Sequence, residues 1–212
     1  RQQHKIVEND TLVAFLPGSI ISEVDRLMPV FKNVSSMLIS QKLNTRIVTV
    51  VAPAVEHIVV ENLQRWGNNI IVVTKDDLSS NDFQKLKRVV FASCDIALAA
   101  SGTVSLELAS TETPTVIAYD MGFLSRLVFR LLVSVKSVNL VNLISEQHTI
   151  PEFIGSNCKP DKIFQALLNQ LEDPTGQKTA MRKSLDLLSV GGEHSGTVAA
   201  KSVIDFLEMR KI

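Results

Sequence analysis

The stretch Asp95-Ile-Ala-Leu-Ala-Ala-Ser-Gly-Thr-Val-Ser-Leu-Glu107 contains a short apolar run, a polar turn with one glycine and the start of a helix-like segment. The run Asp95–Ala99 is typical of a strand in the middle of a parallel sheet. Gly102 lets the chain turn without a Cβ penalty, and Ser101 and Thr103 offer hydroxyls where the first N–H groups of the next helix lack partners. The stretch therefore predicts a strand, a turn and a helix that together can hold an anion such as phosphate.

Glu107 is a carboxylate that helix capping does not explain. If Thr103 caps the helix, the acid of a capping box would stand at position 106, which is Leu. The Glu107 carboxylate is therefore predicted to accept hydrogen bonds from the hydroxyl groups of a ligand.

Similar apolar runs recur along the first 120 residues, and amphipathic segments separate each run from the next. Strands are predicted at Leu12–Leu16, Arg46–Ala52, Ile70–Thr74, Asp95–Ala99 and Pro114–Tyr119. Strands that alternate with helices form a parallel sheet with right-handed crossovers and helices on both sides. The predicted fold class is therefore α/β, a Rossmann-like parallel sheet flanked by helices, which binds ligands at the carboxyl ends of its strands.

The segment after the first predicted strand has the periodicity of an amphipathic helix. Its apolar residues recur at a spacing of three or four and form one face: Val24, Leu27, Phe31, Val34 and Leu38. Pro29 is expected to kink this helix or to mark a restart.

Beyond about Leu140 the strand signal fades. Helices are predicted at Pro160–Leu171, Gln177–Ser189 and Ser195–Met209, which form a helical C-terminal tail. We expect a linker at residues 1–10, a ligand-binding domain at 11–172, and C-terminal helices at 173–212 that pack on this domain or cross to another domain or partner. The polar start at Arg1, without an initiator Met, is typical of a linker and indicates a cut fragment.

Composition excludes several classes of function. Lys and Arg together number 22, as do Asp and Glu, so no overall charge attracts nucleic acid or an anionic membrane. No apolar run approaches the ~20 residues of a membrane span, and the start does not resemble a signal peptide. Cys94 and Cys158 lie in unrelated segments, which suits reduced thiols in a cytoplasmic protein.

No metal site and no cofactor is predicted. The four histidines, at positions 4, 57, 148 and 194, lack metal-ligand spacing, and the sequence contains no Gly-x-Ser-x-Gly elbow for a serine nucleophile. It also contains neither Gly-x-Gly-x-x-Gly nor a P-loop, so a dehydrogenase or kinase would lack its motif.

A second turn with a glycine and a hydroxyl, Leu16-Pro-Gly-Ser19, follows the first predicted strand. Alone, such a turn is ordinary. The carboxyl ends of parallel strands lie at the same edge of a sheet, however. Gly18 and Ser19 are therefore predicted to face the same ligand as the Ser101–Thr103 turn.

Together these motifs resemble those of lipid-A-disaccharide synthases. The matching segments are Leu16-Pro-Gly-Ser19 with Glu23-Val24, Ala100-Ser-Gly-Thr103 with Leu106-Glu107, Pro114-Thr-Val-Ile-Ala-Tyr119, Asn142-Leu-Ile144 and Pro151-Glu-Phe-Ile154. The resemblance covers nearly the whole chain and is to the carboxyl-terminal half of that family. The family it resembles is an inverting, metal-independent glycosyltransferase with two Rossmann-like domains, the GT-B architecture.

The resemblance implies a substrate and places it. Such enzymes transfer 2,3-diacylglucosamine from UDP-2,3-diacylglucosamine to 2,3-diacylglucosamine 1-phosphate (lipid X), which gives the lipid A disaccharide and UDP. The pyrophosphate is expected near Ser101, Gly102 and Thr103, and the ribose hydroxyls at Glu107. Asn142 matches an active-site amide and is the candidate catalytic residue; an Asn that only satisfies a turn is an equal alternative. The general base is expected in the missing N-terminal domain. The protein is expected in the cytoplasm, at the inner face of the bacterial inner membrane.

Three positions depart from the family pattern. Ile20 and Asp120 stand where the family typically has Arg, and Val141 stands where it has Pro. Ile cannot donate a hydrogen bond, and a carboxylate repels a diphosphate that it faces. The departures leave open a catalytically degenerate UDP-binding or assembly module, or another GT-B sugar-nucleotide enzyme. Nearby cations that can replace the lost charge are Arg126, Arg130 and Lys136.

The segment 123–133 is strongly apolar with two interspersed arginines. We interpret it as a helix buried against the sheet, and a surface for acyl chains or a lipid interface is the alternative.

Overall fold

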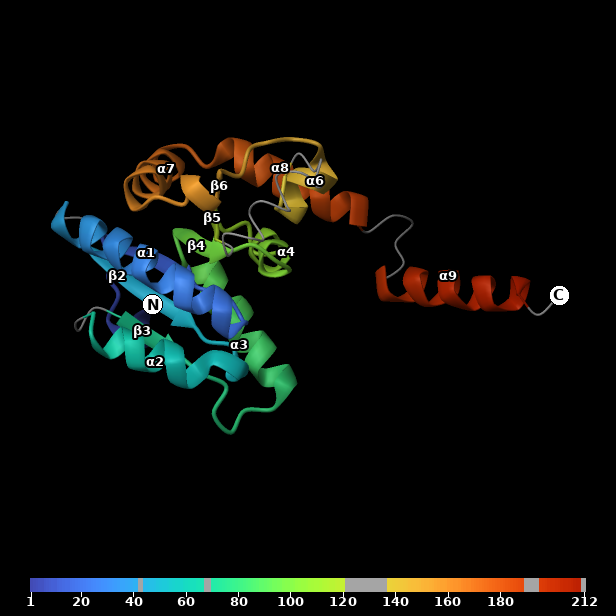
Figure 1. The fold of residues 1–212 in the computed structure, drawn as a ribbon, viewed down its shortest axis with the longest axis horizontal. Helices are drawn as coiled ribbons and strands as arrows, with labels where there is room; N and C mark the ends of the chain where they lie inside the picture. Colours follow the sequence, from blue (N-terminus) through green and yellow to red (C-terminus); the bar gives the residue numbers. More distant parts are fainter. Residues whose placement is uncertain (42–43, 67–69, 121–136, 189–194, 211–212) are drawn as a thin grey trace.

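A parallel sheet forms the centre of the protein in the computed structural model (Figure 1), which describes residues 1–41, 44–66, 70–120, 137–188 and 195–210. Its strands in these ranges are β1 (Thr11–Leu16), β2 (Thr45–Val50), β3 (Ile70–Val73), β4 (Ile96–Ala100), β5 (Thr115–Tyr119) and β6 (Glu152–Ile154). They lie in the order β3-β2-β1-β4-β5-β6. Every neighbouring pair is parallel. The winding therefore reverses between β1 and β4, the place where such sheets bind ligands.

The five predicted strands are confirmed, with ends that shift by at most two residues. The expectation that strands end before Leu140 is wrong, because β6 adds a strand at the edge of the sheet beside β5. This strand has only three residues, too few to show the alternation by which strands are recognised in a sequence.

Helices cover both faces of the sheet. Their bounds are α1 (Ile21–Ser40), α2 (Glu56–Gln64), α3 (Ser80–Ser93), α4 (Val104–Ala109), α6 (Leu140–Ser145), α7 (Pro160–Glu172), α8 (Thr175–Leu188) and α9 (Ser195–Met209). The single-turn helices are η1 (Gln2–His4), η2 (Pro53–Val55) and η3 (Gly155–Asn157). The α1 helix runs without interruption through Pro29, so a restart there is wrong.

The two faces of β1 belong to different parts of the core, because successive side chains of a strand point in opposite directions. Val13 and Phe15 pack with residues of α1 and α7 on one face. Leu12, Ala14 and Leu16 pack with residues of α3, α4 and α8 on the other. The Phe15 ring meets the Phe31 ring edge-on, with centroids 5.3 Å apart. Burial on both faces makes β1 a central strand of a fully covered sheet.

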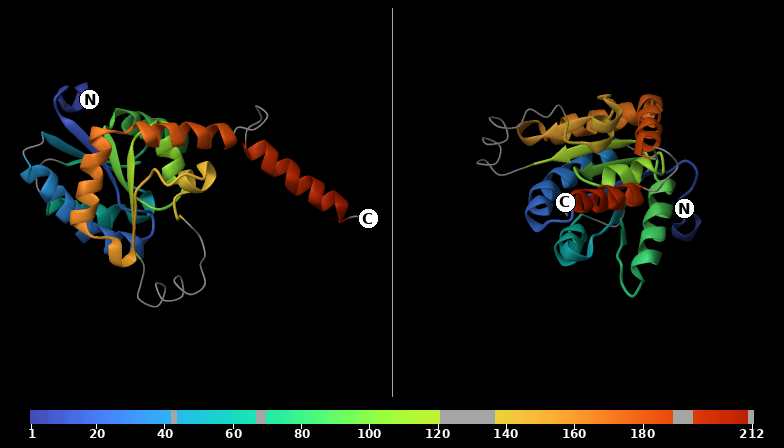
Figure 2. Two further views of the ribbon diagram at one scale, coloured as in Figure 1. Left: turned by 90° about the horizontal axis from the view of Figure 1, so that it is seen from above. Right: turned by 90° about the vertical axis from the view of Figure 1, so that its right-hand side faces the viewer.

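The C-terminal helices differ in how they attach. Gln177 of α8 is buried and bonds both backbone groups of Thr115: its Oε1 accepts from N at 2.7 Å, and its Nε2 donates to O at 2.8 Å. α8 is thus bonded to the start of β5. In contrast, the α9 residues from 196 to 209 are exposed, and the helix lies away from the sheet (Figures 1 and 2).

The first ten residues, predicted as a linker, lie against the sheet domain. Ile6 is buried in the core. The Arg1 guanidinium donates to the carbonyl of Ser93 at 3.1 Å and pairs with Asp95. Their role in joining another domain stays a prediction.

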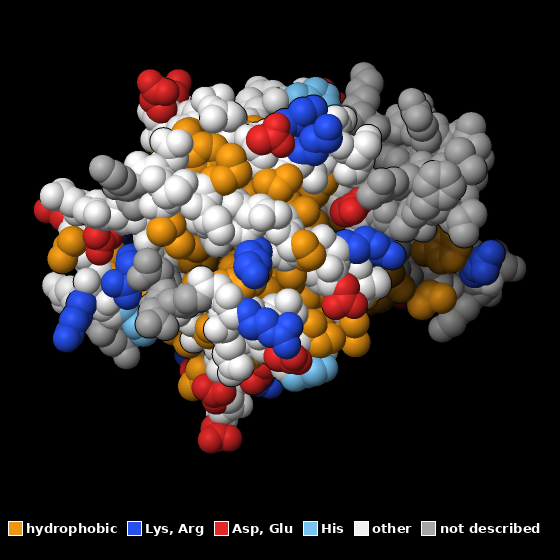
Figure 3. All heavy atoms as spheres, turned by 60° about the vertical axis from the view of Figure 1, so that its left-hand side comes forward, with side chains coloured by type: hydrophobic (Ala, Val, Ile, Leu, Met, Phe, Trp, Pro, Cys, Tyr) orange, Lys and Arg blue, Asp and Glu red, His pale blue; other side chains and the backbone are white. Residues whose placement is uncertain are grey.

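Surface charge is mixed. On the face drawn in Figure 3, basic, acidic and hydrophobic side chains lie among one another. This agrees with the formal net charge of zero. None of the described helices is both long and apolar enough to cross a membrane.

Cys94 should resist alkylation in the folded protein. Burial, and to a smaller extent the charge of Asp95, raise the pKa of its thiol to about 12. At a pH of about 8 the thiolate fraction is then about 1 in 10,000, and the thiolate is the reactive form. We expect iodoacetamide to modify the partly exposed Cys158 and to reach Cys94 only after unfolding. Peptide mass spectrometry measures this, and equal modification of both thiols in the native chain would contradict it.

Candidate functional site

A cavity of about 380 Å³ opens at the carboxyl ends of β1, β2 and β4. It lies where the winding of the sheet reverses, and α3 forms one of its walls. The glycine, polar and aromatic residues that line it are Gly18, Ser19, Glu23, Lys75, Ser80, Phe83, Gln84, Lys87, Phe91, Ser101, Gly102, Thr103 and Glu107. The cavity thus contains both predicted turns and Glu107, although the turns are more than 80 residues apart in the sequence.

The turn after β1 is shaped by Gly18. Its φ is +118°, and a Cβ atom there would lie 2.0 Å from Oε2 of Glu23. The same Oε2 accepts a hydrogen bond from the backbone N of Ser19 at 3.3 Å. Burial raises the pKa of Glu23, and the Ser19 bond partly offsets that rise. The glycine therefore makes room for a carboxylate that holds the turn beside the cavity.

The turn after β4 is tied to the segment before α6. Ser101 Oγ donates to the carbonyl of Val138 at 2.8 Å. Gly102 has a φ of +155°, a conformation that side chains disfavour, and a Cβ there would meet nothing within 4 Å. Thr103 stands at the N-cap of α4, and its side chain makes no capping bond. The backbone turn is thus fixed, while the Gly102 side lies open toward the cavity.

Glu107 of α4 forms an ion pair with Lys87 of α3. Its Oε2 lies 2.5 Å from Lys87 Nζ. The same Oε2 is buried and counts no hydrogen-bond partner in the described part of the chain. The contact between Glu107 Oε2 and Lys87 Nζ is therefore a charge pairing. Lys87 Nζ also lies 5.8 Å from the centroid of the Phe91 ring.

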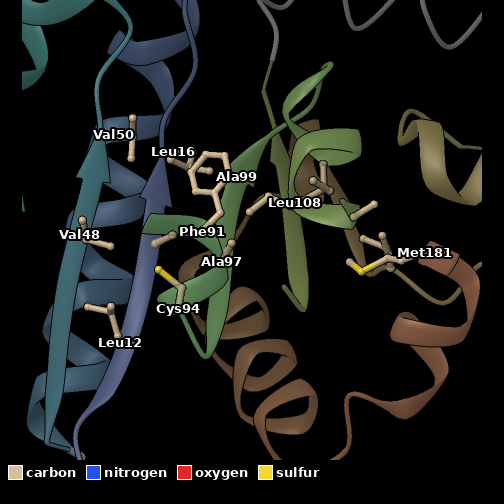
Figure 4. Packing of buried hydrophobic residues seen from close by; sticks show 14 of the residues in the cluster. Leu12, Leu16, Val48, Val50, Phe91, Cys94, Ala97, Ala99, Leu108 and Met181 are labelled. Atoms are coloured by element: carbon tan, nitrogen blue, oxygen red, sulfur yellow. The ribbon is translucent and has the colours of Figure 1, made fainter. Parts of the chain in front are cut away.

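The aromatic side of the cavity continues into the core. Figure 4 shows the Phe91 ring close to Leu16 of β1 and Ala99 of β4. Phe91 and Leu16 also line the cavity. Phe91 is 1% exposed. The wall that carries Lys87 is therefore anchored to the central strands.

Asn142 lies outside the cavity lining. It is buried, its Nδ2 donates to the carbonyl of Ile150 and to Glu152 Oε1, each at 2.8 Å, and its Oδ1 accepts from Ile150 N at 3.0 Å. These hydrogen bonds correspond to the alternative in which the Asn142 amide only satisfies backbone and side-chain groups of a turn. A catalytic role for Asn142 stays a prediction.

Four functional candidates were not predicted as site residues: Glu23, Lys75, Gln84 and Lys87. For Lys87 the sequence does hold a signal. Phe83, Lys87 and Phe91 follow one another at a spacing of four, so the lysine stands on the apolar side of an amphipathic helix. A cation at such a position needs a partner, since burial of an unpaired charge is costly.

Of the positions that depart from the family pattern, Ile20 is 63% exposed beside the turn after β1 and does not line the cavity. Asp120 follows β5 and also lies outside the lining. Arg126, Arg130, Lys136 and the apolar segment 123–133 lie outside the described residues. Within the described residues, no three His, Cys, Asp or Glu side chains come together in a way that could hold a metal ion.

Comparison with known proteins shows which family the sequence resembles. The family model described as lipid-A-disaccharide synthetase matches residues 1–203. A lipid-A-disaccharide synthase of Ruegeria pomeroyi is 39% identical over 192 residues, which are 91% of this chain and 48% of that protein. The same enzyme of Paramagnetospirillum magneticum is 33% identical over 216 residues, 100% of this chain and 53% of that protein. The chain therefore spans about half the length of the curated relatives it matches.

Among solved structures, a spinosyn rhamnosyltransferase complexed with thymidine diphosphate matches 93% of this chain and 46% of its own, with a TM-score of 0.59 at 12% identity. Such a likeness shows the fold alone, and it confirms the predicted half of a GT-B architecture. The family match extends over nearly the whole sequence and includes both turns that line the cavity. The chain belongs to the lipid-A-disaccharide synthetase family.

Proposed function

We propose that this chain is the donor-binding half of a lipid-A-disaccharide synthase, and that the cavity between β1 and β4 holds the UDP part of UDP-2,3-diacylglucosamine. One observation carries the proposal. The Ser101–Thr103 turn, the Gly18–Ser19 turn and Glu107 line the same cavity of about 380 Å³ at the point where the sheet reverses. That is where sheets of this order bind nucleotides.

The chemistry of the lining supports a nucleoside diphosphate. Lys75 brings positive charge, and the hydroxyl of Thr103 and the open backbone at Gly102 can bond phosphate oxygens. Glu107 can accept hydrogen bonds from a ribose diol. A thymidine diphosphate bound to a rhamnosyltransferase of the same fold supports this assignment further.

In the proposed reaction, a lipid X hydroxyl attacks the donor sugar with inversion, UDP leaves, and the lipid A disaccharide forms. This chain would hold and orient the donor, which lowers the barrier by positioning. The base that deprotonates the acceptor would come from the other half of the enzyme, since the relatives are about twice as long.

We further propose that residues 11–172 form the sugar-nucleotide domain and that residues 173–212 pack on it or cross to the other half or a partner.

Both substrates carry acyl chains, so we place the reaction on the cytoplasmic side of the bacterial inner membrane, with the enzyme at the lipid surface. Membrane binding is measurable by sedimentation of the protein with vesicles of inner-membrane lipids. Failure to bind these vesicles would remove this part of the proposal.

UDP binding tests the donor site. By isothermal titration, we expect the intact chain to bind UDP and Glu107→Ala to weaken binding about ten- to hundredfold, because hydrogen bonds to a charged acceptor are lost. Glu61→Ala is the matched control, since Glu61 is exposed on α2 and pairs only with Arg65 among the described residues. No UDP binding by the intact chain, or the same affinity in Glu107→Ala, would contradict the proposal.

Ile20 and Asp120 favour a second candidate, a UDP-binding module that no longer catalyses transfer. Both candidates predict UDP binding, so turnover must separate them. The test joins this chain to the missing half and measures UDP release from the diacylated donor. Clear turnover would exclude the degenerate module.

A further inference from the structure

Lys87 and Glu107 come from different helices and meet at the cavity. α3 and α4 contact each other, and both side chains line the same cavity. The Lys87 side chain is only 18% exposed, whereas that of Glu107 is 37% exposed. The lysine is therefore the more enclosed partner, and its position is set by the core as well as by the carboxylate.

Two contacts fix the Lys87 ammonium group. It lies 2.5 Å from Glu107 Oε2 and 5.8 Å from the centre of the Phe91 ring. Phe91 is buried. A lysine held by a carboxylate and an aromatic face has little freedom left, so the pair is a fixed part of the wall.

The pairing divides the Glu107 carboxylate into two parts. Oε2 is buried against Lys87. The exposed part of the side chain therefore belongs to its other atoms, and no hydrogen bond from a described residue occupies Oε1. Because one oxygen is held and the other is available, the carboxylate can receive hydroxyl groups without first reorienting.

Lys87 also balances charge. The ionisable groups among the described lining residues are Glu23, Glu107, Lys75 and Lys87. Without Lys87, the Glu107 charge would have no close counterion and would repel an anionic ligand. A contact of Lys87 with phosphate is less compatible with its position, because its ammonium group is already beside Glu107.

We propose that Lys87 is a positioning residue, which holds the Glu107 carboxylate so that it accepts the hydroxyl groups of the nucleotide ribose and thereby selects ribose over a sugar without them. The inference rests on the proposed donor site. It goes beyond that site, because it assigns the recognition of the diol to a pair of residues.

The test compares UDP with 2′,3′-dideoxy-UDP, which lacks both hydroxyl groups, by isothermal titration with the 212-residue chain. We expect the native chain to favour UDP by about tenfold or more. Lys87→Met should lose most of this preference, as should Glu107→Gln. The double variant should lose no more than either single one, since the two residues act as a unit.

Two further variants separate positioning from structure. Lys87→Arg keeps a cation beside Glu107 and should keep the preference for UDP. Lys85→Met is the matched control on the same helix, because Lys85 pairs with Asp82 and does not line the cavity. It should bind both nucleotides as the native chain does. Thermal unfolding establishes that each variant is folded at the temperature of the titration.

The failures can be told apart. If the native chain does not bind UDP, the proposed donor site fails. If it binds UDP with a preference that Glu107→Gln removes and Lys87→Met retains, the site stands and the role of Lys87 is overturned. If Lys87→Met binds UDP and uridine equally but still prefers ribose, Lys87 contacts phosphate, which also overturns the inference.

Discussion

Replacement of Glu152 by Ala is expected to lower the free energy of unfolding by about 3–5 kcal/mol, because several enclosed donors lose their acceptor at once. Glu152 Oε1 accepts from Ser137 Oγ, from Asn139 N at 3.2 Å and from Asn142 Nδ2 at 2.8 Å. Its Oε2 accepts from Val138 N at 2.9 Å. The carboxylate thus joins β6 to the whole segment that leads into α6.

The same carboxylate supports the candidate site indirectly, through Val138. Ser101 Oγ donates to the carbonyl of Val138, whose N–H bonds Glu152. If Glu152→Ala frees this segment, the Ser101 turn loses its support, and UDP binding should weaken together with stability. Urea unfolding followed by circular dichroism gives the first quantity, and isothermal titration gives the second.

Glu152→Gln should have about half the effect of Glu152→Ala, because one amide oxygen still accepts hydrogen bonds while the NH₂ group faces donors. Glu172→Ala is the control, since Glu172 is exposed at the end of α7. Its effect should stay within about 0.5 kcal/mol. An effect of that size for Glu152→Ala would show that the network contributes little.

The sequence predicts the fold well where local pattern decides the structure. The strands β1 to β5 are long enough to read as apolar runs, and the helices between them keep their periodicity. β6 was missed because it is a three-residue edge strand. Its place depends on β5 and on the bonds of Glu152 to residues 137–142, and such long-range contacts leave no periodic trace in the sequence.

The sequence predicts which turns form the candidate site, but it predicts less well which charged side chains line it. Glycine with neighbouring hydroxyls marks Gly18, Ser19 and the Ser101–Thr103 turn, and these residues meet at the cavity. Whether a polar side chain faces a ligand or another side chain depends on packing, however. Asn142 bonds Ile150 and Glu152 instead of lining the cavity. Lys87 reaches Glu107 only because α3 and α4 lie side by side.

Replacement of Gly18 by Ala is expected to cost about 2–4 kcal/mol of stability and to weaken UDP binding more than tenfold. Two causes add. A φ of +118° is rarely adopted by residues with a side chain, which costs about 1–3 kcal/mol. The new Cβ would also lie 2.0 Å from Glu23 Oε2, so the carboxylate must move and release the Ser19 N–H. Both turn residues line the cavity, so binding falls with stability.

The two causes can be separated by a second substitution. Glu23→Ala in the Gly18→Ala background removes the collision and leaves the backbone strain, so the double variant should be more stable than Gly18→Ala alone. Gly176→Ala is the matched control within α8, where a Cβ meets nothing within 4 Å and φ is not positive. It should leave stability unchanged or raise it by up to about 1 kcal/mol. If Gly18→Ala behaves like Gly176→Ala in urea unfolding and UDP titration, the turn after β1 tolerates a side chain and its close fit to Glu23 has no part in the site.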